Sequence, residues 1–86
     1  MTGINMPVRS RLKLLMSQRN TERIRAGLEP WKIRELAEAA DLSPSVVSGL
    51  TSNRAGQVRF DTLDKLCRVL ECEPGDILER VREDGR

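Results

Sequence analysis

Small polar residues recur along residues 44–52 at spacings that place them on one side of a helix. They are Ser45, Ser48, Gly49 and Ser52. At about 100° per residue they lie opposite Val47 and Leu50, whose spacing indicates a buried face. Hydroxyl groups exchange hydrogen bonds with base edges and phosphates, and small residues let a helix approach closely. A solvated face usually carries Lys and Glu, and this one has neither, so we favour contact with a nucleic acid.

Two short helices joined by a tight turn must position this face. The first of them has an apolar stripe formed by Leu36, Ala37 and Ala40. The stripe ends at Asp41, and Ser43 then suits the N-cap of a second helix that has Pro44 at its first position. An apolar helix, a turn and a capped helix form a helix-turn-helix, whose second helix enters the major groove of DNA. We therefore expect residues 44–52 to bind double-stranded DNA.

Polar and basic residues around this helix extend the candidate DNA surface. Ser43 lies where free backbone N–H groups and the helix dipole favour an anion. The other candidates, beyond Pro44 and the small outer face, are Asn53, Arg54, Gln57, Arg59 and Arg19. Asn53 also suits the left-handed position that ends a helix. Further basic residues precede the second helix of the motif: Arg9, Arg11, Lys13, Arg23, Arg25, Lys32 and Arg34. Because their mixed spacing wraps around helices, we expect about half of them to be only solvated.

Charge is distributed unevenly along the chain. Residues 1–59 hold ten Lys or Arg and five Asp or Glu, a net +5, whereas residues 60–86 hold five and eight, a net −3. A basic region that contains the helix-turn-helix is typical of a phosphate-binding surface. Simple solvation of surface helices would also explain the asymmetry, which alone does not decide the function.

The whole pattern predicts one all-α domain of five helices. We place it at residues 7–81, between a flexible start at 1–6 and a frayed tail at 82–86. The first helix begins near Pro7 and ends either near Asn20 or at a cap on Gly27. The second begins at Pro30, with Ile33 on its inner face. The fourth has Asp61 as its N-cap and the fifth runs from 77 to about 81.

Two groups of apolar residues lie outside the helix-turn-helix, one in residues 24–31 and one in the last helix. We expect Ile24, Leu28 and Trp31 to pack against the core. The pattern leaves open whether Arg23 and Arg25 contact DNA as a basic arm. The last helix carries Ile77, Leu78 and Val81, and one helical face cannot bury all three deeply. They form either a homodimer interface or a cap on the monomer core, and we weigh the two equally.

Other classes of function find little support. The chain has no His, no visible carboxylate pair and no Gly-rich phosphate loop, so we expect no enzyme, cofactor or small-molecule substrate. Cys67 and Cys72 cannot close a zinc site alone, and Cys67 follows an apolar helical face as a small hydrophobe. No apolar run reaches the roughly 18–20 residues of a membrane span, and the start is not a secretory signal. We expect a cytoplasmic protein with no membrane partner.

From about Val8 to Val81, the chain resembles the lambda-repressor-like, or Xre-type, helix-turn-helix regulators. The resemblance is carried by Leu36-Ala37, Leu42-Ser43, Val47, Ser48 and Leu50, and later by Asp61-Thr62-Leu63-Asp64-Lys65-Leu66-Cys67 and Pro74-Gly75-Asp76-Ile77-Leu78. It implies a compact five-helix domain that binds operator DNA, usually as a homodimer, and represses or tunes transcription.

Three positions depart from the pattern of that family. Asp41 stands where Gly is usual in the turn, but Asp tolerates the left-handed conformation. Ile33 replaces a Gln that touches phosphate in many members, and Pro44 replaces a Gln that reads bases. These departures predict more reliance on phosphate contacts and DNA shape. The alternative is a protein-interaction module, such as an antitoxin or adaptor, favoured by the apolar last helix and the acidic C-terminal half.

Overall fold

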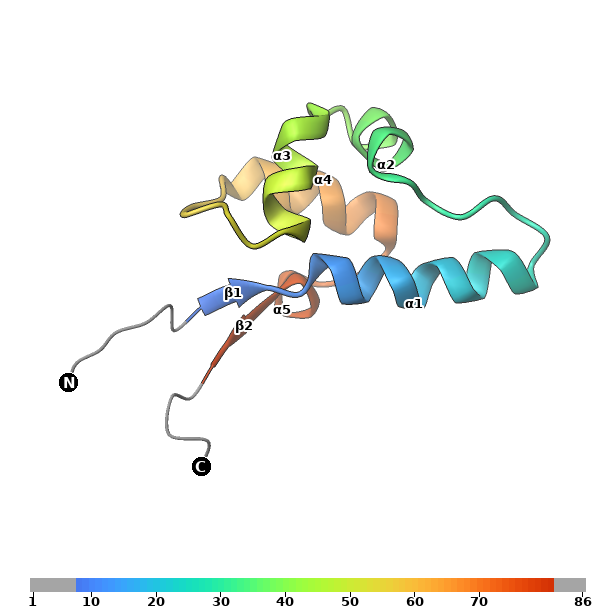
Figure 1. Ribbon diagram of the computed structural model, residues 1–86, viewed down its shortest axis with the longest axis horizontal. Coiled ribbons are helices and arrows are strands. Elements are labelled where there is room, and N and C mark those ends of the chain that lie inside the picture. Colours follow the sequence, from blue (N-terminus) through green and yellow to red (C-terminus); the bar gives the residue numbers. More distant parts are fainter. Residues whose placement is uncertain (1–7, 82–86) are drawn as a thin grey trace.

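The computed structural model describes residues 8–81, which form five helices and a two-stranded sheet (Figure 1). The helices are α1 (Leu12–Arg25), α2 (Ile33–Ala39), α3 (Pro44–Thr51), α4 (Phe60–Leu70) and α5 (Pro74–Ile77), and the strands are β1 (Val8–Ser10) and β2 (Leu78–Arg80). The expected flexible start, the expected helix start at Pro7 and the expected frayed tail at 82–86 lie outside the described residues. Among residues 8–81, no helix is long and apolar enough to cross a membrane.

The sheet corrects the strictly all-α expectation at both ends of the domain. Strands β1 and β2 are antiparallel, with Arg9 opposite Glu79, where helix residues were expected. The fifth helix accordingly spans Pro74–Ile77 and does not run from 77 to about 81, because residues 78–80 form β2. The two strands are about seventy residues apart in the sequence. The spacing of apolar residues within either segment cannot predict a contact between them.

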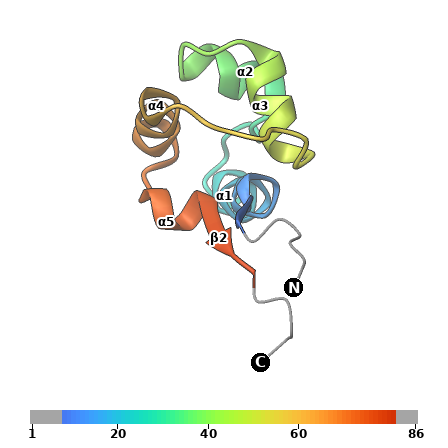
Figure 2. The same ribbon diagram turned by 90° about the vertical axis from the view of Figure 1, so that its left-hand side faces the viewer.

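The core draws on all five helices. Its buried apolar residues are Leu12, Leu15, Met16, Leu36, Ala37, Ala40, Val47, Leu50, Leu63, Leu66, Leu70 and Ile77. In the end-on view, α2 and α3 lie above α1, with α4 and α5 to one side (Figure 2). Each fully buried Leu or Val contributes about 1.5–3 kcal/mol of transfer free energy. Helix α3 is therefore anchored through one face and leaves the other open.

Helix α1 takes the longer of its two predicted lengths. It reaches Arg25, and Gly27 has a φ of +79°, the left-handed conformation that commonly follows a helix. The end of α1 and the connector after it extend past the other helices (Figure 1). Helix α2 begins at Ile33, not at Pro30, because residues 28–32 form an extended connector.

Contacts along this extension differ from the expected packing. Trp31 is half-buried against the core, and the Arg23 guanidinium lies 4.1 Å from the centre of its ring. Ile24 and Leu28, however, are 60 % and 53 % exposed, so the expectation that they pack against the core is wrong. Ile33, expected on the inner face of α2, is also at the surface. Ile24 and Leu28 lie on the projecting end of α1 and the connector after it, which explains their exposure.

The turns around α3 follow the sequence closely. The Ser43 Oγ atom accepts a hydrogen bond from the Val46 N–H at 3.3 Å, which confirms its role as N-cap. Asp41 and Asn53 both have φ of 58°, the left-handed conformation predicted for each. At α4 the expectation differs by two residues, because Arg59 is the N-cap position and Asp61 lies in the first turn.

Candidate nucleic-acid interface

Helix α3 presents its small residues outward, as predicted. Val47 and Leu50 are buried in the core, whereas Ser45 and Ser52 are exposed. Gly49 is half-buried, and a Cβ atom built there would meet only the Ala55 Cβ, at 3.8 Å, an ordinary contact. Packing does not require glycine at this position. Its effect is to lower the outer surface of α3.

Hydroxyl groups on α3 differ in the hydrogen bonds left to them. The Ser52 and Thr51 hydroxyls donate to the Ser48 carbonyl at 2.9 and 3.0 Å. Their protons are engaged, so their oxygens are available mainly as acceptors. The Ser43 and Ser45 Oγ atoms are 3.3 Å apart, and either can donate. The face thus offers acceptors at its C-terminal end and adaptable hydroxyls at its N-terminal end.

Grooves run along both sides of α3, so that this helix forms a ridge. One groove lies toward the loop after α3 and is lined by Ser45, Val46, Gly49, Arg54, Gln57 and Arg59. The other side faces α1 and the start of α2, with polar lining residues Lys13, Ser17, Lys32, Thr51 and Ser52. A ridge between cation-bearing grooves matches a helix in a DNA groove with a phosphate backbone on each side.

Basic residues divide into those engaged within the protein and those left free. Ion pairs hold Arg9 and Arg11 to Glu79, Arg19 to Glu22, Arg59 to Asp61, Lys65 to Asp41 and Arg68 to Asp64. Within residues 8–81, the cations without an ion pair or a ring contact are Lys13, Arg25, Lys32, Arg34, Arg54 and Arg80.

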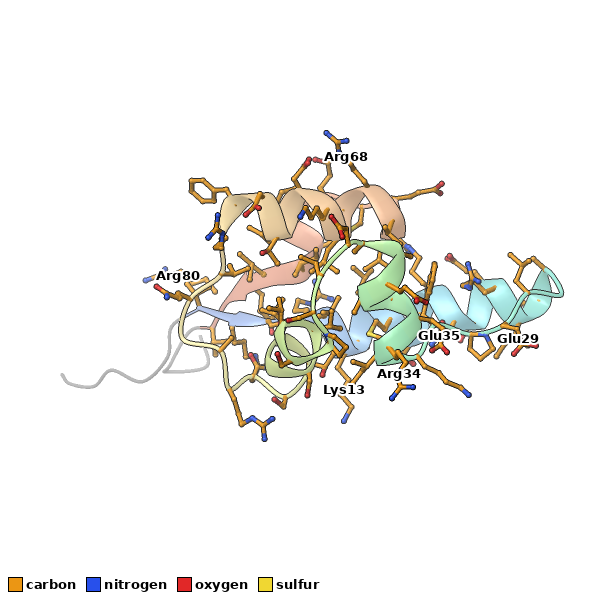
Figure 3. The ribbon with its side chains drawn as sticks, turned by 90° about the horizontal axis from the view of Figure 1, so that it is seen from above. Lys13, Glu29, Arg34, Glu35, Arg68 and Arg80 are labelled. Atoms are coloured by element: carbon orange, nitrogen blue, oxygen red, sulfur yellow. The ribbon has the colours of Figure 1, made fainter. Side chains whose placement is uncertain are left out.

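Two of these free cations point to the side of the molecule that α2 and α3 share. Lys13 and Arg34 project together there, whereas Arg68 lies on the opposite side (Figure 3). Lys13 and Lys32 line the groove beside α3 but were not singled out among the basic residues of the sequence. Their spacing along the chain gave no signal, because the groove forms only when α1 packs beside α3.

Arg19, which was expected at the DNA surface, is half-buried and holds the end of α4. Its Nε atom donates to the Leu70 carbonyl at 2.8 Å, and Nη2 donates to the Glu71 carbonyl at 3.4 Å. The guanidinium therefore closes the C-terminus of α4, where backbone acceptors are unpaired and positive charge is favourable.

Asn53 is also engaged within the protein. The Ser10 N–H donates to Asn53 Oδ1 at 2.7 Å, and Asn53 Nδ2 donates to the Ser10 carbonyl at 3.0 Å. One lone pair of Oδ1 and one N–H of Nδ2 are used, the other of each stays available, and the expected contact of this exposed side chain with DNA stays a prediction. Ser43, Pro44, Ser45, Ser48, Gly49, Ser52, Arg54, Gln57 and Arg59 all lie on α3 or beside it.

The residues expected at a dimer interface separate in the same way. Ile77 is fully buried in the monomer, so its assignment to a dimer interface is wrong. Leu78 and Val81 are half-buried and keep some accessible surface. For these two residues, a dimer contact remains a prediction.

The two cysteines are half-buried thiols. Both are free and partly buried against the core. Burial raises the pKa of the Cys67 thiol, and it raises the pKa of the Cys72 thiol to about 12. Both thiols are therefore neutral near pH 7, and Cys67 packs as the small hydrophobe that was predicted.

Together, the capped ridge helix and the turn before it define a helix-turn-helix protein. Residues 11–83 match the Cro/C1-type HTH DNA-binding domain family, and the chain belongs to that family. It is 42 % identical over 53 residues to the uncharacterized HTH-type transcriptional regulator YozG of Bacillus subtilis (strain 168). That alignment covers 60 % of this chain and 63 % of the relative.

A solved structure shows the same fold. It is the crystal structure of a candidate DNA-binding protein from Bacteroides fragilis, with a TM-score of 0.64 and 22 % sequence identity. The similarity covers 84 % of this chain and 98 % of the other.

Proposed function

We propose that the protein is a sequence-specific transcriptional regulator that acts as a repressor by inserting α3 into the major groove of its operator. The observation that carries this proposal is the ridge of α3, whose exposed face is small and hydroxylated. Free cations flank it on both sides, including Lys13, Lys32 and Arg54. Bases would then face the ridge, and phosphates the flanks.

Recognition would depend strongly on the DNA backbone. Residues 43–52 hold no Arg, Lys, Asn or Gln, the side chains that form paired hydrogen bonds with guanine or adenine. Serine contacts discriminate less sharply between bases. We therefore infer that phosphate contacts and sequence-dependent groove shape supply much of the specificity.

We propose a homodimer as the DNA-bound form. A two-fold operator needs two copies whose recognition helices are about 34–36 Å apart. Leu78 and Val81, which keep some accessible surface, are the candidate contacts. Sedimentation with and without duplex would give the stoichiometry, and one protein per enriched duplex would contradict the dimer.

The deciding experiment is selection from a random duplex library at near-physiological salt. An enriched inverted repeat with half-sites about 10 bp apart would establish an operator-binding dimer. No enrichment would contradict the proposal.

Gly49→Glu is the matching variant, because it places a carboxylate on the ridge, where there is room for a side chain. It should abolish binding without unfolding the domain. Gly75→Glu is the control, since a Cβ there meets nothing within 4 Å and the residue lies on α5. Unchanged binding by Gly49→Glu would contradict the placement of α3.

A second candidate function is a protein-interaction module. Phe60 is 89 % exposed, and the projecting end of α1 exposes Ile24 and Leu28. Aromatic side chains are enriched at protein interfaces, so the Phe60 side chain is a candidate contact with a partner. Purification of a stoichiometric protein partner, with no duplex retained, would favour this function over the first.

A further inference from the structure

We propose that Asn53 is a positioning residue for DNA recognition, which ties the end of α3 to strand β1. Reading of the operator would then depend on the β1–β2 sheet that joins the two ends of the domain. This proposal rests on the proposed function of α3 as the DNA-reading helix.

Asn53 stands two residues beyond the end of α3 in the left-handed conformation, with a φ of 58°. Its carboxamide bonds both backbone groups of one residue, Ser10, at 2.7 and 3.0 Å. Ser10 lies 43 positions earlier in the sequence. The pair therefore closes a long-range link at the point where the helix gives way to the flanking loop.

Ser10 is a junction within the fold. It lies opposite Leu78 in the antiparallel sheet, where only alternate residues turn their N–H and C=O groups toward the partner strand. Since both groups of Ser10 bond Asn53, they point away from β2, and the carboxamide occupies the place of a third strand. The Ser10 hydroxyl also accepts from the Leu12 N–H at 3.0 Å, at the start of α1.

The link controls residues that face the DNA. Ser52 and Arg54 are the chain neighbours of Asn53, and both lie at the candidate surface. The Arg54 and Ala55 N–H groups donate to the Gly49 carbonyl at 3.0 and 3.2 Å, so the turn is built on the reading helix. Binding sites need supporting contacts that hold their groups to within about 0.5 Å. Loss of the carboxamide should therefore loosen the C-terminal end of the ridge.

Asn53→Gly tests this role because glycine keeps the left-handed backbone and removes only the side chain. The matched control is Glu71→Gly, at another left-handed position with φ of 54°, after α4. Binding is measured by fluorescence anisotropy on the selected duplex and on a scrambled duplex, at a temperature where circular dichroism shows each variant folded. Asn53→Gly should bind the selected duplex about tenfold more weakly, with scrambled-duplex affinity within about twofold of the wild type. Glu71→Gly should bind both like the wild type.

Amide hydrogen exchange provides the second readout. In Asn53→Gly, exchange of the Ser10, Arg54 and Ala55 amides should accelerate, while the buried turns of α4 keep their protection. Full affinity of Asn53→Gly for the selected duplex, an equal loss on both duplexes, or unchanged exchange at residues 54–55 would each overturn the positioning role. If the wild type selects no duplex, the proposed function itself fails and this inference falls with it. If the wild type binds and the variant is unaffected, only the inference fails.

Discussion

Arg19 should contribute to the stability of the domain and not to its affinity for DNA. Its guanidinium donates to the Leu70 and Glu71 carbonyls, which close the end of α4. Replacing Arg19 with alanine removes both bonds and the positive charge at the negative end of the helix dipole.

The loss can be estimated from the contacts. A hydrogen bond to a charged group contributes about 1.5–3 kcal/mol. The second bond is long, at 3.4 Å, and the Arg19 side chain is 27 % exposed, so water replaces part of what is lost. We therefore expect the free energy of unfolding to fall by about 1.5 kcal/mol, at the lower end of that range. In a domain of this size, such a change lowers Tm by about 6–12 °C.

Urea denaturation followed by circular dichroism measures this change. Arg25→Ala is the control, because Arg25 is an exposed residue of the same helix without an ion pair among residues 8–81, and it should stay within about 0.5 kcal/mol of the wild type. Duplex affinity, measured where every variant is folded, should not change in Arg19→Ala. Equal stability of Arg19→Ala and Arg25→Ala, or a tenfold loss of duplex affinity by folded Arg19→Ala, would contradict the assignment of Arg19 to the fold.

The free cations, the core and the buried thiols each lead to a further prediction. Lys13→Ala should reduce the slope of log Kd against log salt by about 0.9, the value for one phosphate contact, while Arg68→Ala on the opposite side should leave it unchanged. Equal slopes for both variants in anisotropy titrations would contradict a phosphate contact by Lys13. Leu66→Ala should cost about 2–5 kcal/mol in urea denaturation because the side chain is fully buried, whereas the exposed Ile24→Ala should cost less than about 0.5 kcal/mol. The pKa of Cys72 is raised to about 12, above its ordinary value of 9.0, so iodoacetamide at pH 8 should label the folded protein more slowly than the unfolded chain. Equal labelling rates in the folded and unfolded chains would contradict the raised pKa. By linkage, the stabilising contribution of Cys72 is present below pH 9.0 and is lost as the pH rises toward 12.

Local sequence was sufficient for α3 and its turns. Ser43 and Pro44 start α3 through contacts within one helical turn, and the spacing of Val47 and Leu50 sets its buried side. Asp41 and Asn53 tolerate the left-handed conformation because of their own short polar side chains. Each of these features depends on residues at most four positions apart, so inspection of the sequence could recover it.

The sequence by itself thus determined which helix could read DNA and which of its faces lies outward, since both follow from caps and periodicity. Only the tertiary structure decided which polar side chains remain available to a ligand. Arg19 is engaged by carbonyls 51 and 52 positions away, Asn53 by a strand 43 positions away, and the β1–β2 sheet pairs the two ends of the domain. The physical reason is that a side chain's free hydrogen bonds depend on every group packed around it, and most of those groups are distant in the sequence.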